Sequence, residues 1–416
     1  MSHNPTAVFP SIHQNISLQH EQPRFLPERI RLLSLAIVCA VAPTLRADSD
    51  ITTCIAHIRA VGREGSGNVE ASKAWKELVR SGPDALPIIL KGFDGADATA
   101  ANWLRLAVDV IGEKALASNI SFPAAALETF IMQKDHSGSA RRLAYEWLVR
   151  VDPKASERLL PDMLQDPSVE LRRDAVARSL GLAQKRLDRK DTSGAFAEFR
   201  KALSGARDRD QVDQIAKKLK SLGQEVDLPA HFGFIRTWHL IGPFDSTGGI
   251  GFEKAYPPEE GVDLAGQYPG KKGDRLAWKS HTTQDPYGLV DLNKVLGKNM
   301  GAVGYASAAV TSPIERPVDI RAASNNAVKI FLNGKLICFR EEYHHGMEMD
   351  QHSGVGTLKP GRNEILIKVC QNEQTEDWAQ MWSFQLRVCD SVGGGVPLAG
   401  NGNGANGNNG ERKVSP

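Results

Sequence analysis

The fold of this chain is decided by the stretch Val328-Lys-Ile-Phe-Leu-Asn-Gly-Lys-Leu-Ile-Cys-Phe-Arg340. Two runs of β-favouring residues flank an Asn-Gly pair, which accepts the positive backbone angles of a tight hairpin turn. A second turn at Pro360-Gly361 leads into another apolar run at residues 364–370. Both faces of the hairpin are largely apolar, which is typical of strands enclosed between two layers. The sequence therefore predicts a β-domain around this hairpin.

The turn also predicts the register of the hairpin. If positions 332 and 335 close the turn, Val328 lies opposite Phe339. Other short apolar runs, separated by Gly, Pro and Asn turns, predict strands at residues 234–241, 288–292, 302–311, 318–322 and 382–389. The first of these should end at Gly242-Pro243, because proline donates no hydrogen bond to a ladder. Short strands with such turns are typical of an antiparallel β-sandwich or jelly roll.

The region before the β-domain is predicted to be helical. From residue 48 to 223 it is rich in Ala, Leu, Arg, Glu and Lys, with apolar residues at helical spacing. An Arg-x-Ala pattern places alanines at 107, 144 and 175, which are 37 and 31 residues apart. A period in the thirties with two helices per unit is typical of an α-solenoid. An irregular helical bundle is the alternative.

One turn in this region carries a family resemblance. Residues 166–176, Asp-Pro-Ser-Val-Glu-Leu-Arg-Arg-Asp-Ala-Val, resemble the turn and first helix of a HEAT repeat. The resemblance implies that Asp166 caps a helix and that Ala175 lets neighbouring helices approach closely. Residues 182–222 resemble a tetratricopeptide-type helix pair, which would form the last unit. HEAT-like solenoids mostly bind proteins or peptides along a concave face, so the resemblance implies a protein partner.

The β-domain resembles a second family. The opening Trp238-His-Leu-Ile-Gly-Pro-Phe244, the Asn-Gly hairpin and Leu358-Lys-Pro-Gly-Arg-Asn-Glu-Ile-Leu-Ile-Lys-Val369 are together similar to galactose-binding-like jelly rolls. Such domains are appended to many secreted glycoside hydrolases and exported bacterial proteins. Over residues 234–390 the resemblance implies a sandwich that could bind carbohydrate, and it assigns no ligand residue.

The N-terminus predicts export. Residues 30–47 combine basic residues with an apolar run that is too short to span a bilayer, and Ala47 offers a cleavage point. A short buried helix or an uncleaved anchor is the alternative. Lys and Arg total 51 against 49 Asp and Glu, a balance that does not indicate nucleic acid. We expect a periplasmic or secreted protein with no stable membrane span after cleavage.

Cleavage would leave four of the five cysteines. We expect residues 364–370 and 383–389 to be adjacent strands, which would hold Cys370 and Cys389 about 20 Å apart. A disulfide needs Cα atoms within about 7 Å. The sequence therefore predicts no bridge between these two cysteines and mostly free thiols.

Two loops of the β-domain contain candidate site residues. The first has imidazoles and carboxylates that could bind a divalent metal: His344, His345, Asp350 and His352, with Glu341, Glu342 and Glu348 beside them. A polar loop that happens to hold histidines is the alternative. The second surrounds an indole suited to stacking on a sugar, and its candidate ligands are Trp378, Gln371, Asn372, Gln374 and Asp377. We expect Trp382, which heads an alternating strand, to lie in the core.

The sequence thus predicts five parts: a leader and signal peptide (1–47), a HEAT-like helical repeat domain (48–223), a linker (224–233), a β-sandwich (234–390) and a disordered Gly/Asn-rich tail (391–416). No zinc-protease, phosphate-loop or serine-nucleophile motif is present in the sequence. We therefore expect a non-enzymatic exported scaffold without a cofactor, whose helical repeats bind a protein partner and whose β-sandwich could bind carbohydrate. The alternative is an accessory subunit or module of a glycan-degrading hydrolase.

Overall fold

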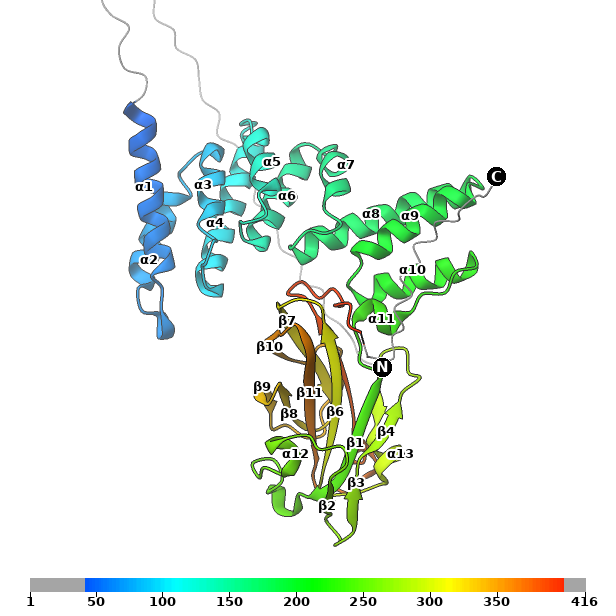
Figure 1. The fold of residues 1–416 in the computed structure, drawn as a ribbon. Helices are drawn as coiled ribbons and strands as arrows, with labels where there is room; N and C mark the ends of the chain where they lie inside the picture. The colour runs from blue at the N-terminus through cyan, green and yellow to red at the C-terminus, as the bar shows by residue number, and fades with distance from the viewer. Residues whose placement is uncertain (1–41, 400–416) are drawn as a thin grey trace, which may run out of the picture. The chain divides into compact units, whose positions relative to one another are not determined.

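The computed structural model describes residues 42–399, with side chains described from Asp50 onward. Helices come first and antiparallel sheets follow, so the chain combines an α region with a β region (Figure 1). The helices of the first region are α1 (Ala42–Arg59), α2 (Asn68–Leu78), α3 (Leu86–Lys91), α4 (Ala98–Ala117), α5 (Ala124–Met132), α6 (Gly138–Val151), α7 (Ala155–Leu159), α8 (Val169–Asp188), α9 (Thr192–Gly205), α10 (Arg209–Ser221) and α11 (Leu228–Phe232).

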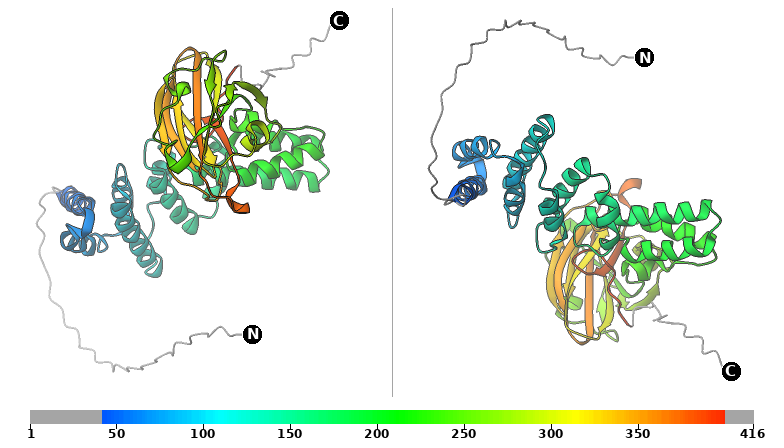
Figure 2. Two further views of the ribbon diagram at one scale, coloured as in Figure 1. Left: turned by 90° about the horizontal axis from the view of Figure 1, so that it is seen from below. Right: turned by 90° about the horizontal axis from the view of Figure 1, so that it is seen from above.

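The predicted cleavage point after Ala47 lies within α1, and the apolar run before it lies mostly outside the described residues. None of the helices between residues 42 and 399 is both long and apolar enough to cross a membrane. Neighbouring helices pack as pairs, α3 with α4, α5 with α6 and α8 with α9 (Figure 2). The alanines at 107, 144 and 175 are all buried, which lets these helices approach closely.

Asp166, in the turn before α8, does not cap this helix as predicted. Ser168, not Asp166, caps α8, because its hydroxyl accepts the Leu171 amide. The Asp166 carboxylate instead accepts two hydrogen bonds from Arg141 of α6, at 2.8 and 2.7 Å, and one from the Ser168 amide. Arg141 also donates to the Ile131 carbonyl at 2.6 Å. This fully buried ion pair ties α6 to the turn that starts α8.

The β region contains a six-stranded sheet of order β4-β1-β6-β11-β8-β9, a four-stranded sheet of order β10-β7-β12-β5, and a small β2-β3 ladder. All ladders between these strands are antiparallel. The elements are β1 (Thr237–Asp245), α12 (Pro257–Glu260), β2 (Gln267–Pro269), β3 (Arg275–Ala277), β4 (Lys279–Thr282), β5 (Val290–Asp291), α13 (Leu292–Leu296), β6 (Ala302–Ser312), β7 (Arg316–Ser324), β8 (Ala327–Leu332), β9 (Lys335–Arg340), β10 (His352–Leu358), β11 (Gly361–Gln371) and β12 (Ser383–Cys389).

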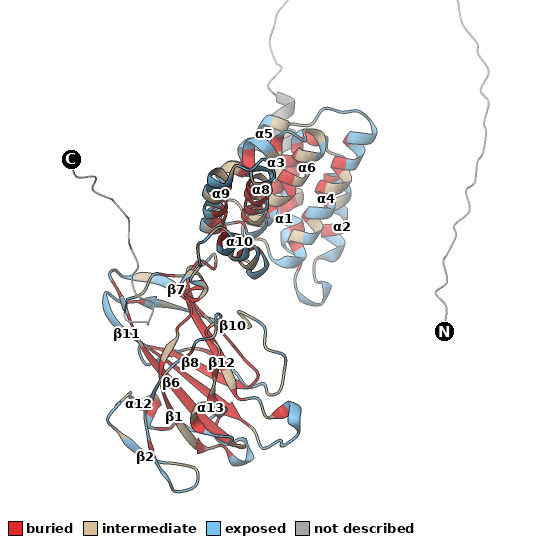
Figure 3. Ribbon diagram, turned by 90° about the vertical axis from the view of Figure 1, so that its right-hand side faces the viewer, coloured by how far each residue is buried: buried red, intermediate tan, exposed pale blue. Residues whose placement is uncertain are grey.

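Strand β11 is covered on both sides, which explains why apolar side chains lie on both of its faces. Ile365 and Ile367 belong to the core that the two larger sheets share, and this core also holds Leu386 of β12. Leu366 and Cys370 point the other way, into a second core that a segment including Phe252, Tyr256 and Leu276 covers. Successive strand residues face opposite sides, so a central strand covered on both faces needs apolar residues at most positions. Figure 3 shows buried residues along most of the strands of these sheets.

The predicted register of the hairpin is correct at the turn and wrong beyond it. Leu332 pairs with Lys335 as predicted, but a register shift between Ile330 and Phe331 places Val328 opposite Arg340 rather than Phe339. An extra residue at a bulge displaces every later pair by one position.

Strand β1 does not end at Gly242-Pro243 as predicted. Its pairing with β6 shifts between Ile241 and Phe244, and then continues through Phe244 opposite Val303. The irregularity accommodates the proline, which donates no hydrogen bond, without ending the strand.

Strand β10 was missed in the sequence, because its glycines interrupt the apolar pattern. A Cβ atom at Gly354 would lie 2.6 Å from the Ile337 carbonyl oxygen, and one at Gly356 would lie 2.5 Å from Cδ2 of Leu332. Gly354 is therefore required where β10 packs against the backbone of β9, whereas a Cβ at Gly356 would displace only the end of the Leu332 side chain.

The four cysteines are free as predicted, but the predicted pairing of residues 364–370 with 383–389 is wrong. Strands β11 and β12 are not neighbours but belong to different sheets, so Cys370 and Cys389 lie in separate ladders. Among the described residues, Cys54, Cys338, Cys370 and Cys389 are all free thiols. Burial raises the pKa of the Cys389 thiol to about 11, which keeps this thiol protonated at neutral pH.

The predicted linker and part of the predicted tail are ordered. Residues 228–232 form α11, and Phe232 and Phe234 pack in the core of the helical region, whereas Ile235 already belongs to the core between the sheets. Beyond β12, Val396 is buried and its amide donates to the Val388 carbonyl at 3.1 Å. The first residues of the predicted tail are therefore packed, and residues 400–416 lie outside the described part of the chain.

Candidate functional site

The two candidate loops of the β region, which the sequence analysis treated separately, meet in the structure. The His344 Nε2 group donates a hydrogen bond of 2.6 Å to Oδ1 of Asn372. The His344 ring also lies edge-to-face with the Trp378 indole, with ring centroids 5.4 Å apart. His344 holds a positive φ of 55°, an uncommon conformation for a residue other than glycine. One histidine of the first loop thus supports the aromatic residue of the second.

The two tryptophans of the second loop have opposite environments. Trp378 lies in a short 3-10 helix, η5 (Asp377–Ala379), and is 59% exposed, with Met381 also exposed nearby. Trp382 is fully buried, and its Nε1 group donates to the Val369 carbonyl at 3.2 Å. As expected from its place at the head of β12, Trp382 is a core residue. Trp378 is therefore the indole that a ligand can reach.

The polar candidates around Trp378 are not equally available. Gln371 is fully buried, where its Oε1 accepts from Asn326 and its Nε2 donates to the Ala379 carbonyl at 2.9 Å. Its assignment as a ligand residue is therefore corrected, since strand β11 carries its side chain into the interior. Asn372 is half-buried and bonded to His344 and Gln374. Gln374 and Asp377 are exposed, and Asp377 precedes Trp378 in the chain. Gln374 is linked to His344 through Asn372.

The metal candidates do not form one ligand set. His344 is bonded to Asn372, whereas His345 and His352 lie edge-to-face with ring centroids 5.8 Å apart. Within residues 42–399, no three His, Cys, Asp or Glu side chains gather in a way that could hold a metal ion. Burial, together with the neighbouring His345, lowers the pKa of His352. His352 is the first residue of strand β10, and it contacts His345 rather than His344.

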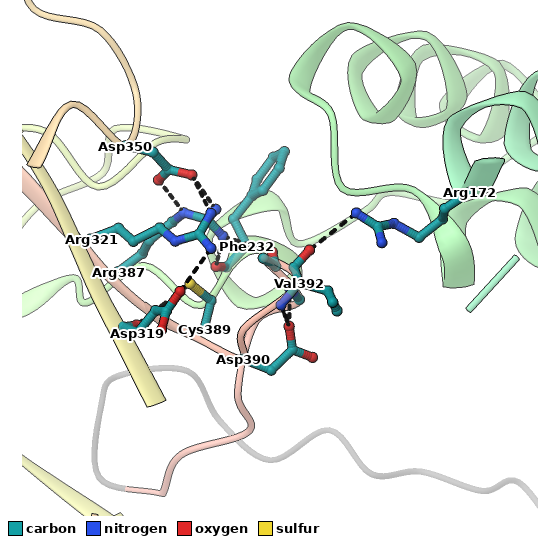
Figure 4. A network of polar contacts seen from close by, with 11 residues as sticks. Arg172, Phe232, Asp319, Arg321, Asp350, Arg387, Cys389, Asp390 and Val392 are labelled. Atoms are coloured by element: carbon teal, nitrogen blue, oxygen red, sulfur yellow. Dashed lines mark hydrogen bonds and ion pairs between the residues drawn. The ribbon is translucent and has the colours of Figure 1, made fainter. Parts of the chain in front are cut away.

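Asp350, the fourth metal candidate, is a structural carboxylate. Figure 4 shows it pointing toward two guanidinium groups. It accepts from Arg387 Nε at 2.6 Å and Nη2 at 2.5 Å, and from Arg321 Nη1 at 3.1 Å. Burial raises its pKa, but the hydrogen bonds and charges of Arg387 and Arg321 outweigh burial and hold the pKa of Asp350 below its usual range. Its oxygens are thus already committed.

The arginines around Asp350 connect the β region with the helical region. Arg387 Nη1 donates to the carbonyls of Phe232 in α11 and Gly393 in the C-terminal segment, both at 3.0 Å. Arg172 of α8 donates to the Val392 carbonyl at 3.2 Å (Figure 4). The Asp350 loop, the last helices and the segment after β12 are therefore joined by one polar network.

A groove in the helical region escaped the sequence analysis. It has a volume of about 990 Å³ and lies between faces of α1, α3 and α5. Its lining residues are Thr52, Ile55, Arg59, Pro87, Ile88, Lys91, Gly92, Asp94, Ala126, Thr129, Phe130, Gln133 and His136. Buried Ile55 and Phe130 with half-buried Ile88 provide its apolar surface. The three helices are far apart in sequence, so local periodicity could not reveal that their faces meet.

The charges in the groove are unevenly paired. The Asp94 carboxylate accepts the Ser137 amide at 2.8 Å and lies 2.7 Å from Nδ1 of His136. The His136 ring in turn stacks on Phe130, with centroids 4.3 Å apart. By contrast, neither Arg59 nor Lys91 makes an ion pair with any residue that the structure describes, and both are exposed. The groove thus combines an apolar floor with two available cations.

Comparisons with known proteins identify no family. No protein-family model matches the chain, and no curated protein matches it. Among solved structures it is similar to an FMN-binding beta-glucuronidase from Facaelibacterium prausnitzii L2-6, at 15% identity over 37% of this chain and 22% of that chain, with a TM-score of 0.23. It is also similar to an anti-sigma factor domain-containing protein, at 10% identity over 39% and 49% of the two chains, with a TM-score of 0.23.

A third similarity is to the alkylpurine DNA glycosylase AlkC of Pseudomonas fluorescens, at 10% identity over 84% of this chain and 96% of that one, with a TM-score of 0.20. The chain spans 22% and 49% of the lengths of the beta-glucuronidase and the anti-sigma factor domain-containing protein. At these TM-scores none of the similarities supports an argument about function, which must come from the sites themselves.

Proposed function

We propose that this protein is an exported, non-enzymatic scaffold whose helical region is a HEAT-like solenoid that binds a protein partner. The observation that carries the proposal is the groove of about 990 Å³ between α1, α3 and α5. Helical repeats commonly bind partners along a surface to which several successive helices contribute. An apolar floor with a polar rim is the usual anatomy of such a docking surface.

The groove suits a segment of a protein better than a fully enclosed small molecule. Its volume is at the upper end of the range of about 300–1,000 Å³ for ligand pockets. Thr52, Thr129 and Gln133 along it are exposed, so the groove opens to solvent rather than enclosing its occupant. An amphipathic segment of a partner could place its apolar side chains on Ile88 and Phe130.

Blocking the groove tests the proposal. Thr129→Trp places a large side chain on the exposed face of α5 within the groove, whereas Lys73→Trp adds the same side chain to exposed α2 outside it. We expect the full-length protein to capture a specific partner from the exported fraction and Thr129→Trp to lose it. Capture that Thr129→Trp retains as well as Lys73→Trp does would contradict a role for the groove.

Export is a separate part of the proposal, and it has its own test. If residues 1–47 are a cleaved leader, mass spectrometry of the native protein should find an N-terminus at or near Asp48. Recovery of a soluble protein that still carries residues 1–47 would contradict this processing.

A second candidate function is carbohydrate binding by the β region, read as a galactose-binding-like sandwich. Its support is the exposed Trp378 indole, which His344 contacts edge-to-face, together with exposed Gln374 and Asp377 in the same loop. Indole faces stack well on the apolar faces of sugars. In this case the chain would serve as an accessory subunit or module of a glycan-degrading hydrolase. Calorimetric titration of the full-length protein with a glycan panel tests it, and failure of every glycan to bind would remove it.

A further inference from the structure

The groove between α1, α3 and α5 has an excess of available positive charge. Its lining contains four titratable side chains, Arg59, Lys91, Asp94 and His136. The only carboxylate among them, Asp94, is already engaged by the Ser137 amide and by His136. The two cations make no ion pair within the part of the chain that the structure describes. An occupant of the groove therefore meets uncompensated positive charge.

The neighbouring acidic residues do not cancel this charge. Helix α3 carries no acidic residue, Glu128 of α5 is bound to Arg158 at 2.9 Å, and Asp50 of α1 does not line the groove. The walls between the cations are apolar, because Ile55, Ile88 and Phe130 contribute to them. Apolar surfaces bounded by charge of one sign favour a ligand with apolar side chains and the opposite charge.

We propose, on the basis of the scaffold function above, that the groove selects partner segments that are apolar and carry carboxylates, with Arg59 and Lys91 as the receptors. A carboxylate that docks beside an apolar contact loses water, and its attraction to a guanidinium or ammonium group is then stronger than on an open surface. Arg59 also has the planar geometry that binds a carboxylate through two hydrogen bonds.

A purely structural role for these two cations is the competing explanation. Arg59 is the last residue of α1 and Lys91 is the last residue of α3. Cations at helix C-termini stabilise the helix through its dipole whether or not a groove lies beside them. Reversal of both charges should then alter stability alone, whereas a receptor role predicts a change in the charge of the bound segments.

A randomised displayed peptide library, selected on the full-length protein at low salt, separates these explanations. We expect enriched peptides to be apolar with a negative net charge. Arg59→Glu/Lys91→Glu should enrich positively charged peptides instead, whereas the matched control Lys73→Glu/Lys76→Glu on α2 should select as the wild type does. An enriched acidic peptide should bind the reversed variant about tenfold more weakly, and this difference should shrink as salt is added.

The blocked variant Thr129→Trp distinguishes failure of this inference from failure of the proposed function. Enrichment of peptides that Thr129→Trp abolishes but that show no charge preference would overturn the inference and leave the groove as a docking site. Enrichment that Thr129→Trp leaves intact would overturn both. Circular dichroism of each variant confirms that the helical region has folded before its selection is interpreted.

Discussion

The helical region and the β region each contain a buried ion pair, but the two pairs connect different kinds of elements. In the helical region, Arg141 of α6 and Asp166 in the turn before α8 are fully buried, and their ion pair joins these two elements. In the β region, the fully buried ammonium of Lys368 is held by Glu259 at 2.7 Å and by the carbonyls of Phe252 and Lys254. The first pair connects two parts of the helical region, whereas the second fastens a covering segment to the outer face of a sheet.

The comparison shows how to separate structural charges from charges available for binding. Both buried pairs have their hydrogen-bonding capacity taken up by nearby groups, which is what makes a charge tolerable away from water. Arg59 and Lys91 in the groove have no such partners in the described part of the chain, and both remain exposed. Four predictions test this distinction.

The largest loss of folding stability is expected in the helical region. Asp166→Ala leaves the Arg141 guanidinium buried without its partner, which should destabilise the protein by about 3–5 kcal/mol in chemical denaturation. Glu113→Ala, which removes the exposed pair with Arg150, is the matched control and should change stability far less. Equal losses for the two variants would show that burial does not distinguish these pairs.

The corresponding change in the β region is Lys368→Met. It keeps much of the side-chain volume but leaves the Glu259 carboxylate without its cation, and we expect a loss of about 3 kcal/mol. Replacing both groups, as Lys368→Met/Glu259→Leu, should recover part of that loss, because no unpaired charge remains. A double variant that is less stable than the single one would argue for a larger role of Glu259, which Tyr305 also contacts.

A smaller and pH-dependent effect is expected at Asp350. Asp350→Asn removes charge from the hydrogen bonds to Arg387 and Arg321 and should cost about 2 kcal/mol at neutral pH. The folded pKa of Asp350 lies below its usual range, so its contribution is present above the unfolded pKa of about 4 and is lost as pH falls through the lower folded pKa.

Thermal melts of the wild type and Asp350→Asn should therefore begin to converge as the pH falls below about 4, and should meet only below the folded pKa of Asp350. Asp377→Asn, an exposed carboxylate of the Trp378 loop, serves as the control and should melt as the wild type does. A difference between Asp350→Asn and the wild type that persists undiminished at acidic pH would contradict the assignment of Asp350 as an ionised anchor.

The smallest effect on stability is expected at Trp378. Trp378→Ala should change the free energy of unfolding by less than about 0.5 kcal/mol, because the indole is largely exposed. The matched change at buried Trp382 should cost about 3–5 kcal/mol. If the loop binds a glycan, Trp378→Ala should weaken that binding by about 1–3 kcal/mol in calorimetric titration. A large drop in melting temperature for Trp378→Ala would assign this indole to the core.

Much of the local structure could be predicted from sequence, because it rests on short-range chemistry. The Asn-Gly pair places a turn between β8 and β9, since few other residues accept its backbone angles. The alternation behind Trp382 separates a buried indole from the exposed one four positions earlier. The bulge in the hairpin and the glycine-containing strand β10 could not be predicted, because both depend on which strands lie alongside.

The sequence was therefore enough to predict that helices precede antiparallel strands, where the main hairpin lies and which tryptophan is buried. The roles of the polar residues depend instead on contacts made in the folded protein. Asp350 resembles a metal ligand in the sequence, yet the fold brings Arg387 and Arg321 against it. The groove likewise exists only because faces of α1, α3 and α5 come together. The apolar pattern that predicts a helix or strand depends on residues close together in the chain. The partners of a polar side chain depend on contacts between residues far apart in sequence.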